Sequence, residues 1–272
     1  MNNKFLTAAA VVAFGFTAQA ASAADAPASD FTVTGSAAIV SQYKFRGLTQ
    51  SDSKPAVQAA ITLSHTSGFY VSMWGSSGAS SRVGPKTTYA SPNEGSEIDI
   101  YGGYTHAIGK TGITFDGGVY GYIYPNVSNY NLYEVYASLS KAYGPVTAKV
   151  GVNWAPKQNY FTLAGTATKY NMYEYLSLAY TPASAPVTVH GYVGHTGGGL
   201  NFVKQYIDYN VGVSYKWKML TLDLSAVGTN ISKSDVAKST GLAWSTAAGS
   251  YANTSTYRYG KFAPVLSLTA SF

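Results

Sequence analysis

The 272-residue sequence contains no cysteine, and only 11% of its residues are charged. The absence of cysteine excludes a disulfide framework and thiolate chemistry. The charge content is low for a water-soluble surface, since about a quarter of the residues in soluble domains are charged. Beyond the N-terminal segment, no apolar run approaches the ~20 residues that a membrane-spanning helix needs. These shortages argue against an ordinary soluble domain and against a helical membrane protein.

The N-terminus has the organisation of a secretory signal peptide. The sequence MNNK precedes the apolar run Phe5–Phe16, and small residues that fit a cleavage site after Ala23 follow it. We therefore predict that residues 1–23 are a signal peptide. Residues 24–30 are then a short periplasmic lead, and residues 31–272 form one domain.

Tyrosine and glycine are abundant, with 24 and 28 residues, in segments where apolar and polar residues alternate. From Phe31 to Arg46, one parity carries mostly apolar side chains and the other mostly polar or small ones. A period of two indicates a strand with two unlike faces. Twelve segments show this pattern: 31–46, 56–65, 69–76, 97–107, 113–124, 132–142, 146–154, 172–181, 187–195, 206–215, 220–229 and 262–272.

The connections between these segments alternate between short and long. The short ones carry glycine or proline, as tight turns require, whereas the longest spans residues 230–261. An even number of strands with short turns at one end and long loops at the other is typical of outer-membrane barrels. The predicted fold class is therefore all-β, a transmembrane antiparallel β-barrel of about 12 strands in the outer membrane of a Gram-negative bacterium. Both termini are expected in the periplasm. The alternative is a secreted β-sandwich, in which short and long loops would have no reason to alternate.

Charged side chains on the inward parity are expected to line the lumen, because charge at membrane depth is costly. Acids outnumber cations there, and most lie near the long-loop end. They form either a constriction that selects solutes by charge and size or a salt-bridge network that plugs the lumen. The predicted pore-lining residues are Lys44, Arg46, Glu97, Asp99, Asp116, Glu134, Lys149, Glu174, Asp208 and Asp223.

Lys44 and Arg46 are predicted to point inward because Tyr43 and Phe45, on the other parity, are assigned to lipid. The segments beside strand 31–46 contain no acid. A partner must therefore lie across the bore or at Asp52 in the following loop. Arg46 is the better anchor, since its planar guanidinium can hold a carboxylate with two hydrogen bonds. The simplest alternative is that both side chains reach the outer water and contact nothing.

Several aromatic residues near strand ends carry the apolar parity or lie in a turn, as in the aromatic belts of membrane proteins. The predicted interface aromatics are Tyr43, Phe45, Tyr133, Trp154, Tyr209 and Trp217. The C-terminal Phe272, which ends the stretch VLSLTASF, is similar to the assembly signal of outer-membrane barrels.

The stretch SQYKFRGLTQSDSKPAVQAAITLSHTSGFYVSMWGSS, residues 41–77, resembles the TorF-type family of outer-membrane porins. EIDIYGGY, residues 97–104, and the final strand also resemble this family. The resemblance covers roughly the first third of the mature chain. It implies a porin and implies neither catalytic residues nor a defined solute.

We therefore expect passive diffusion of small hydrophilic solutes through a charge-lined lumen. The alternative is a non-conducting structural or surface-interaction barrel that binds a partner through its long loops, chiefly 77–96 and 230–261. The expected partners are outer-membrane lipid and lipopolysaccharide, the barrel-assembly machinery and the solute. Ten cations against three acids in the long loops make the outer side positive.

Other function classes receive no support from motifs. The four histidines, His65, His106, His190 and His195, fall on different strands or turns without a nucleophile motif or metal-ligand spacing. We predict no catalytic residue, no metal and no cofactor, so the chain is not expected to be an enzyme. The positive charge belongs largely to the loops, which argues against nucleic-acid binding.

Overall fold

The computed structural model describes residues 29–78, 95–125, 131–163, 170–201, 203–240 and 257–272. The predicted signal peptide, most of the lead after it, most of the long loop 77–96 and half of the long loop 230–261 lie outside the described residues. Within the described part, twelve antiparallel strands close into one barrel, as the sequence predicts. No helix among the described residues is long and apolar enough to span a bilayer.

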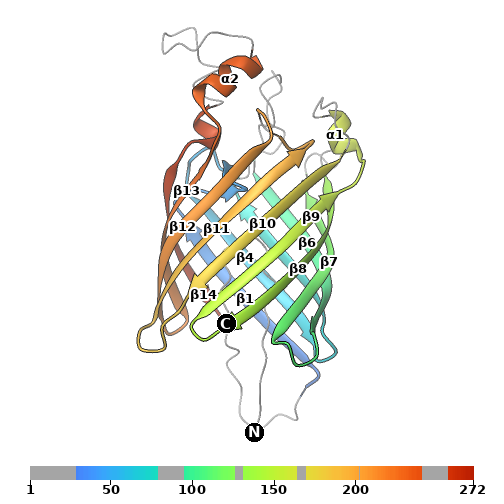
Figure 1. Ribbon diagram of the computed structural model, residues 1–272, viewed down its shortest axis with the longest axis vertical. Helices are drawn as coiled ribbons and strands as arrows, with labels where there is room; N and C mark the ends of the chain where they lie inside the picture. Colours follow the sequence, from blue (N-terminus) through green and yellow to red (C-terminus); the bar gives the residue numbers. More distant parts are fainter. Residues whose placement is uncertain (1–28, 79–94, 126–130, 164–169, 202, 241–256) are drawn as a thin grey trace.

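The wall strands match the predicted ranges to within a few residues, except at the end of the first. Short turns join them at one end, and α1 (Asn159–Leu163) and α2 (Lys233–Thr240) lie at the other end (Figure 1). The strands are β1 (Phe31–Val40), β4 (Ala56–His65), β5 (Phe69–Ser77), β6 (Ser96–Ala107), β7 (Ile113–Ile123), β8 (Leu132–Tyr143), β9 (Val146–Ala155), β10 (Asn171–Tyr180), β11 (Val187–Gly198), β12 (Tyr206–Trp217), β13 (Leu220–Thr229) and β14 (Ala263–Ser271).

The barrel closes where the first strand, β1, pairs with the last, β14. Gly35 N donates to the carbonyl of Phe272 at 2.8 Å, and Phe272 N donates back to the carbonyl of Gly35 at 3.0 Å. A Cβ atom on Gly35 would lie 2.6 Å from Cζ of the Phe272 ring. Glycine at this position therefore lets the terminal aromatic ring lie across the seam.

The two faces of the wall are unlike, and β12 shows the difference clearly. Ile207 and Val211 are exposed on its outer face, whereas Asp208 and Asn210 are buried on its inner face. This distribution is the reverse of that in a soluble protein, where apolar side chains form the interior. An apolar exterior around a polar lumen is the arrangement of a membrane barrel.

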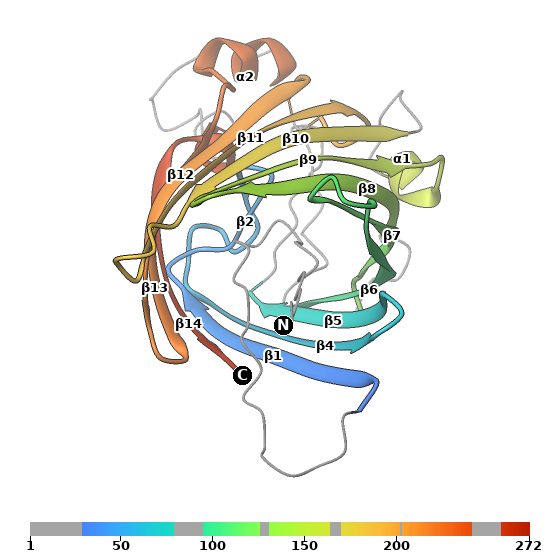
Figure 2. The ribbon, with the colours of Figure 1, turned by 60° about the horizontal axis from the view of Figure 1, so that its bottom comes forward.

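The first wall strand ends at Val40, so the predicted strand 31–46 is too long. The chain leaves the wall there and forms a two-stranded ribbon from β2 (Lys44–Phe45) and β3 (Leu48–Thr49). The ribbon turns through Arg46 and Gly47, whose φ angles are 47° and 77°. Figure 2 shows β2 inside the ring of wall strands. We call residues 41–55 the inner hairpin.

Candidate functional site in the barrel lumen

The lumen carries charged side chains at two levels. The upper lumen lies toward the end with α1 and α2. Its carboxylates come from the ends of β6, β8 and β12 that are nearest to the helices: Glu97, Asp99, Glu134 and Asp208. The lower lumen lies toward the short turns, and its charged groups come from Asp116, Lys149, His190 and Asp223. The upper cluster is the one that the inner hairpin enters.

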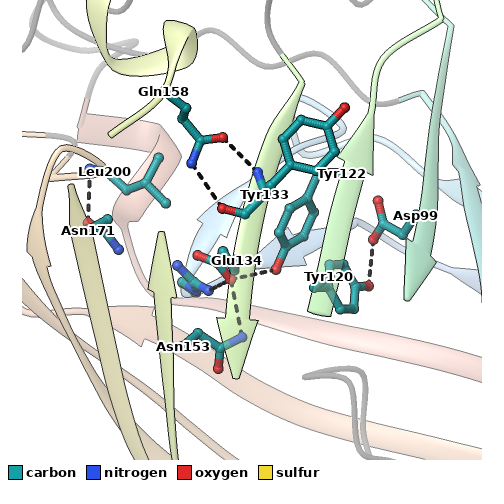
Figure 3. A network of polar contacts seen from close by, with 10 residues as sticks. Asp99, Tyr120, Tyr122, Tyr133, Glu134, Asn153, Gln158, Asn171 and Leu200 are labelled. Carbon is teal, nitrogen blue, oxygen red and sulfur yellow. Dashed lines mark hydrogen bonds and ion pairs between the residues drawn. The ribbon is translucent and has the colours of Figure 1, made fainter. Parts of the chain in front are cut away.

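Glu134 is the centre of the upper lumen, and its carboxylate is fully buried. Arg46 Nη2 donates to Glu134 Oε2 at 2.6 Å. The hydroxyl of Tyr122 and Nδ2 of Asn153 donate to the same oxygen, each at 3.1 Å (Figure 3). Three donors from the inner hairpin, β7 and β9 thus converge on one carboxylate oxygen on β8.

Aromatic rings surround the guanidinium of Arg46. Its Cζ lies 4.2 Å from the centroid of the Tyr173 ring and 4.7 Å from that of Phe45. The Phe45 ring meets Tyr122 edge-on at 5.4 Å. A cation over aromatic faces is attracted by their π electrons, most strongly where water is excluded. We call Phe45, Tyr122, Glu134 and Tyr173 the Arg46 pocket.

The remaining upper carboxylates are held by tyrosine hydroxyls. Tyr43 donates to Glu97 at 3.4 Å, Tyr120 to Asp99 at 2.7 Å (Figure 3), and Tyr173 to Asp208 at 3.2 Å. A hydrogen bond to a carboxylate stabilises the charge without neutralising it. Among the described residues, the upper lumen thus has four carboxyl groups and one guanidinium.

The lower lumen pairs each carboxylate with a basic side chain. Lys149 Nζ lies 3.8 Å from Asp116, and Tyr70 donates to Asp116 at 2.8 Å. The Tyr70 hydroxyl also contacts that of Tyr136. His190 Nε2 lies 2.6 Å from Asp223, which also accepts from Ser225.

The position of Arg46 agrees with the predicted cross-bore pair, because Glu134 stands on β8, away from β1 and its neighbours. Asp52 instead accepts from Arg258 at 2.6 Å. Lys44 Nζ donates to the carbonyls of Gly47, Tyr259 and Lys261, so the alternative that Lys44 contacts nothing is wrong.

Lys44 lies outside the spanning strands, in a site that disfavours its charge. Burial is the main cause and the nearby Lys261 ammonium the second, and together they lower the pKa of Lys44 to about 8. No carboxylate of the described residues forms an ion pair with it.

Three predicted orientations are wrong. Tyr43 and Phe45 do not face lipid, because the chain leaves the wall after Val40 and the parity of β1 no longer applies; both side chains pack inside the barrel. Glu174 does not line the lumen. It shares the outward parity of Leu176 on β10, and its Oε2 lies 3.1 Å from His195 Nδ1 on β11.

The other predicted aromatics are exposed near strand ends: Tyr133, Trp154, Tyr209 and Trp217. Their contact with the membrane interface stays a prediction, as does the role of Phe272 as an assembly signal.

Two groups of lumen residues were not predicted. The inward tyrosines could have been found, since Tyr120 and Tyr122 share the parity of Asp116. The second is His190, the partner of Asp223, which was itself predicted to line the pore.

The chemistry available here is electrostatic. Among the described residues, no group of three or more metal-ligating side chains comes together. The lumen offers carboxylates, one buried guanidinium and aromatic rings, which can attract, orient and discriminate charged solutes.

Comparison with known structures supports a porin-like barrel. The structure described as "KdgM porin" has a TM-score of 0.53 and 12% sequence identity, covering 88% of this chain and 99% of that one. The structure described as "NanC porin structure in rhombohedral crystal form" has a TM-score of 0.52 and 11% identity, covering 89% and 99%. At these identities the likeness concerns the fold alone. No curated protein sequence matches the chain.

A family model does match, and it spans most of the chain. The family is described as "Bacterial protein of unknown function (Gcw_chp)", and the match covers residues 24–257. Because this match extends through most of the barrel, the chain belongs to the Gcw_chp family.

Proposed function

We propose that the protein is an outer-membrane porin through which small hydrophilic solutes diffuse passively. The observation that carries this proposal is the closed barrel with an apolar exterior and a lumen lined by charged groups. Such a wall is stable only with lipid outside, and its polar interior suits water and solutes. The mechanism requires no chemical step, so we propose no enzymatic activity.

The excess of carboxylates in the upper lumen favours a weak preference for cations. Low-dielectric walls concentrate the field of buried charges along the lumen, and salt screens that field. Positive loops at the outer rim would act against it for solutes entering from outside. In this proposal, the level of the Arg46–Glu134 ion pair is the constriction.

The proposed orientation places α1, α2 and the long loops outside the cell and both termini in the periplasm. Loop lysines and arginines would then contact the phosphates of lipopolysaccharide, and Phe272 would be read by the barrel-assembly machinery. We also propose cleavage after Ala23 and membership of the TorF-type group. Protease added to intact cells should cut only in the long loops, and cleavage within 182–186 would contradict this topology.

The main alternative is a non-conducting barrel that binds a partner through its outer loops. One observation favours it: Arg46, Glu134 and Asp208 are at most 2% exposed, so the inner hairpin fills much of the upper lumen. In that case the network would be a structural plug.

Single-channel recording in planar bilayers separates the two functions. A porin should give discrete conductance steps, whereas the alternative predicts none at any voltage. Because the chain has no cysteine, one introduced thiol can be labelled selectively. A bulky thiol reagent should reduce the steps of Thr34→Cys, on the inward face of β1, and should not affect the matched control Val33→Cys on its outward face. If labelling changes the conductance steps of neither variant, the steps do not arise from this lumen.

A further inference from the structure

Arg46 lies in a site where the described part of the chain does not supply hydrogen-bond acceptors for all of its donors. A guanidinium has five N–H donors, and Arg46 uses only Nη2, toward Glu134. Its Nε and Nη1 are buried, and neither has a hydrogen-bond partner within the described part of the chain. Leaving buried donors of a charged group unpaired is costly, so the fit of this side chain to its surroundings is poor.

Acceptors for those donors are present in the same upper lumen. Glu134 Oε1, Asp208 Oδ1 and Asp99 Oδ1 are buried and lack a partner among the residues that the structure describes. Asn210, 3% exposed and one inward position below Asp208, has both amide atoms unpaired on the same basis. Arg46 interacts electrostatically with Asp208 but makes no hydrogen bond to it in this structure. Unpaired donors and unpaired acceptors therefore lie in the same part of the lumen without hydrogen bonds between them.

The backbone that carries Arg46 explains why its unpaired donors do not reach the unpaired acceptors. Its backbone lies in the left-handed region, with φ 47°, which non-glycine residues rarely adopt. Gly47 follows with φ 77°, and a Cβ atom there would lie 2.8 Å from Cβ of Asp208. The ribbon of β2 and β3 thus lies close against the wall, and its backbone holds the guanidinium at Glu134 instead of at the unpaired acceptors. A free ligand would not have this restriction.

The pocket defines the chemistry of such a ligand. Fully buried Glu134 and neighbouring Asp208 require a cation. The rings of Tyr173 and Phe45, on which Arg46 lies, favour a flat and weakly hydrated one. Several acceptors around the centre favour a group with many N–H donors in one plane. A guanidinium meets all three conditions, whereas an ammonium is compact and strongly hydrated.

We propose that the Arg46 pocket is a binding site for small organic cations of the guanidinium class, and that Arg46 is its tethered occupant in this structure. The pocket takes such a cation only where Arg46 does not fill it, so the proposal concerns this binding site and not the solute that crosses the wild-type lumen. As a binding site, it can be tested without any conductance measurement.

The test is chemical rescue of Arg46→Ala. Removing the side chain empties the pocket, and the melting temperature (Tm) of the refolded barrel should fall. Millimolar ethylguanidinium should restore most of that loss, with a rise in Tm that follows the logarithm of its concentration. Ethylammonium at equal ionic strength and the uncharged N-ethylurea are the matched ligands and should restore little. Wild-type protein, whose pocket is filled, should show no rise.

A second variant assigns the rescue to the pocket. Arg46→Ala combined with Glu134→Gln lacks the central carboxylate and should not respond to ethylguanidinium. If Arg46→Ala does not refold alone, the measured quantity is its refolding yield with ethylguanidinium against N-ethylurea, and a higher yield with the cation supports the proposal. Equal effects of the three ligands, or equal rescue without Glu134, would overturn it. If ethylguanidinium fails to rescue the variant but the protein conducts, the binding site is contradicted and the porin function stands. If ethylguanidinium rescues the variant but the protein does not conduct, the binding site stands and the porin function is contradicted.

Discussion

The upper and lower halves of the lumen hold their carboxylates in different ways. In the lower half, Asp116 and Asp223 each face a basic side chain, Lys149 and His190, and these basic groups remain partly exposed. In the upper half, Arg46 pairs with one of four carboxyl groups, that of Glu134, and tyrosine hydroxyls donate to the other three. Among the described residues, the lower half has two carboxyl groups beside two basic side chains, whereas the upper half has four carboxyl groups and one guanidinium.

This difference indicates where discrimination between solutes would arise. A balanced and partly hydrated pair has a weak field, because each charge is cancelled nearby and screened by water. A carboxylate that stays charged in a buried position acts over a longer range, because the surrounding dielectric is low. The upper lumen should therefore govern both selectivity and a larger share of stability than the lower lumen.

The largest expected effect is that of removing Arg46. Arg46→Ala leaves Glu134 buried without its cation and should lower the free energy of unfolding by about 3–5 kcal/mol. The matched change in the lower lumen, Lys149→Ala, should cost only about 1 kcal/mol, because that pair is longer and partly exposed. Urea unfolding in detergent measures both, and similar losses would mean that the two halves do not differ.

A smaller effect is expected from tyrosine hydroxyls. Tyr120→Phe removes the donor to Asp99 Oδ2, and the other oxygen of Asp99 is already unpaired within the described structure, so the loss should be about 2 kcal/mol. Tyr70→Phe should cost about 1 kcal/mol, since Asp116 keeps Lys149. The same urea titration compares them, and a larger loss for Tyr70→Phe would reverse the ranking of the two levels.

The smallest effect concerns pH and the inner hairpin. Burial lowers the pKa of Lys44 to about 8, below that of a lysine in the unfolded chain, about 10.4. Between these values the unfolded state binds more protons than the folded state, so stability should rise with pH across this window. Lys44→Met should lack that rise. Unfolding measured between pH 7.5 and 10 in ~0.5 unit steps tests this, and identical slopes for both proteins would show that Lys44 is not the group involved.

Most of the wall could be predicted from the sequence because a period of two and the sorting of loop lengths are local signals. The bounds of β4 and β13 agree with the predicted 56–65 and 220–229. The inner hairpin could not be predicted, since residues 41–46 continue the alternation of β1 although the chain has left the wall.

The site was predictable in part for a related reason. Inward acids such as Glu134 and Asp208 followed from parity on long strands. The lack of nearby acids predicted a partner for Arg46 across the bore or at Asp52, without identifying Glu134. The argument from the parity of Arg46 was wrong, although its inward position was right. Glu174 was misplaced because its strand carries leucine and glutamate on one parity. Tertiary contacts, such as a hydroxyl that reaches a carboxylate, leave no periodic signal.

The central claim is that uncancelled carboxylates of the upper lumen govern passage through the barrel. The measurement that tests it most directly is the reversal potential of the wild-type channel in a potassium chloride gradient at low salt. We predict a modest cation preference that weakens as salt screens the carboxylates. A clear anion preference at low salt would contradict the account and assign selectivity to Arg46, Lys44 or the positive outer loops.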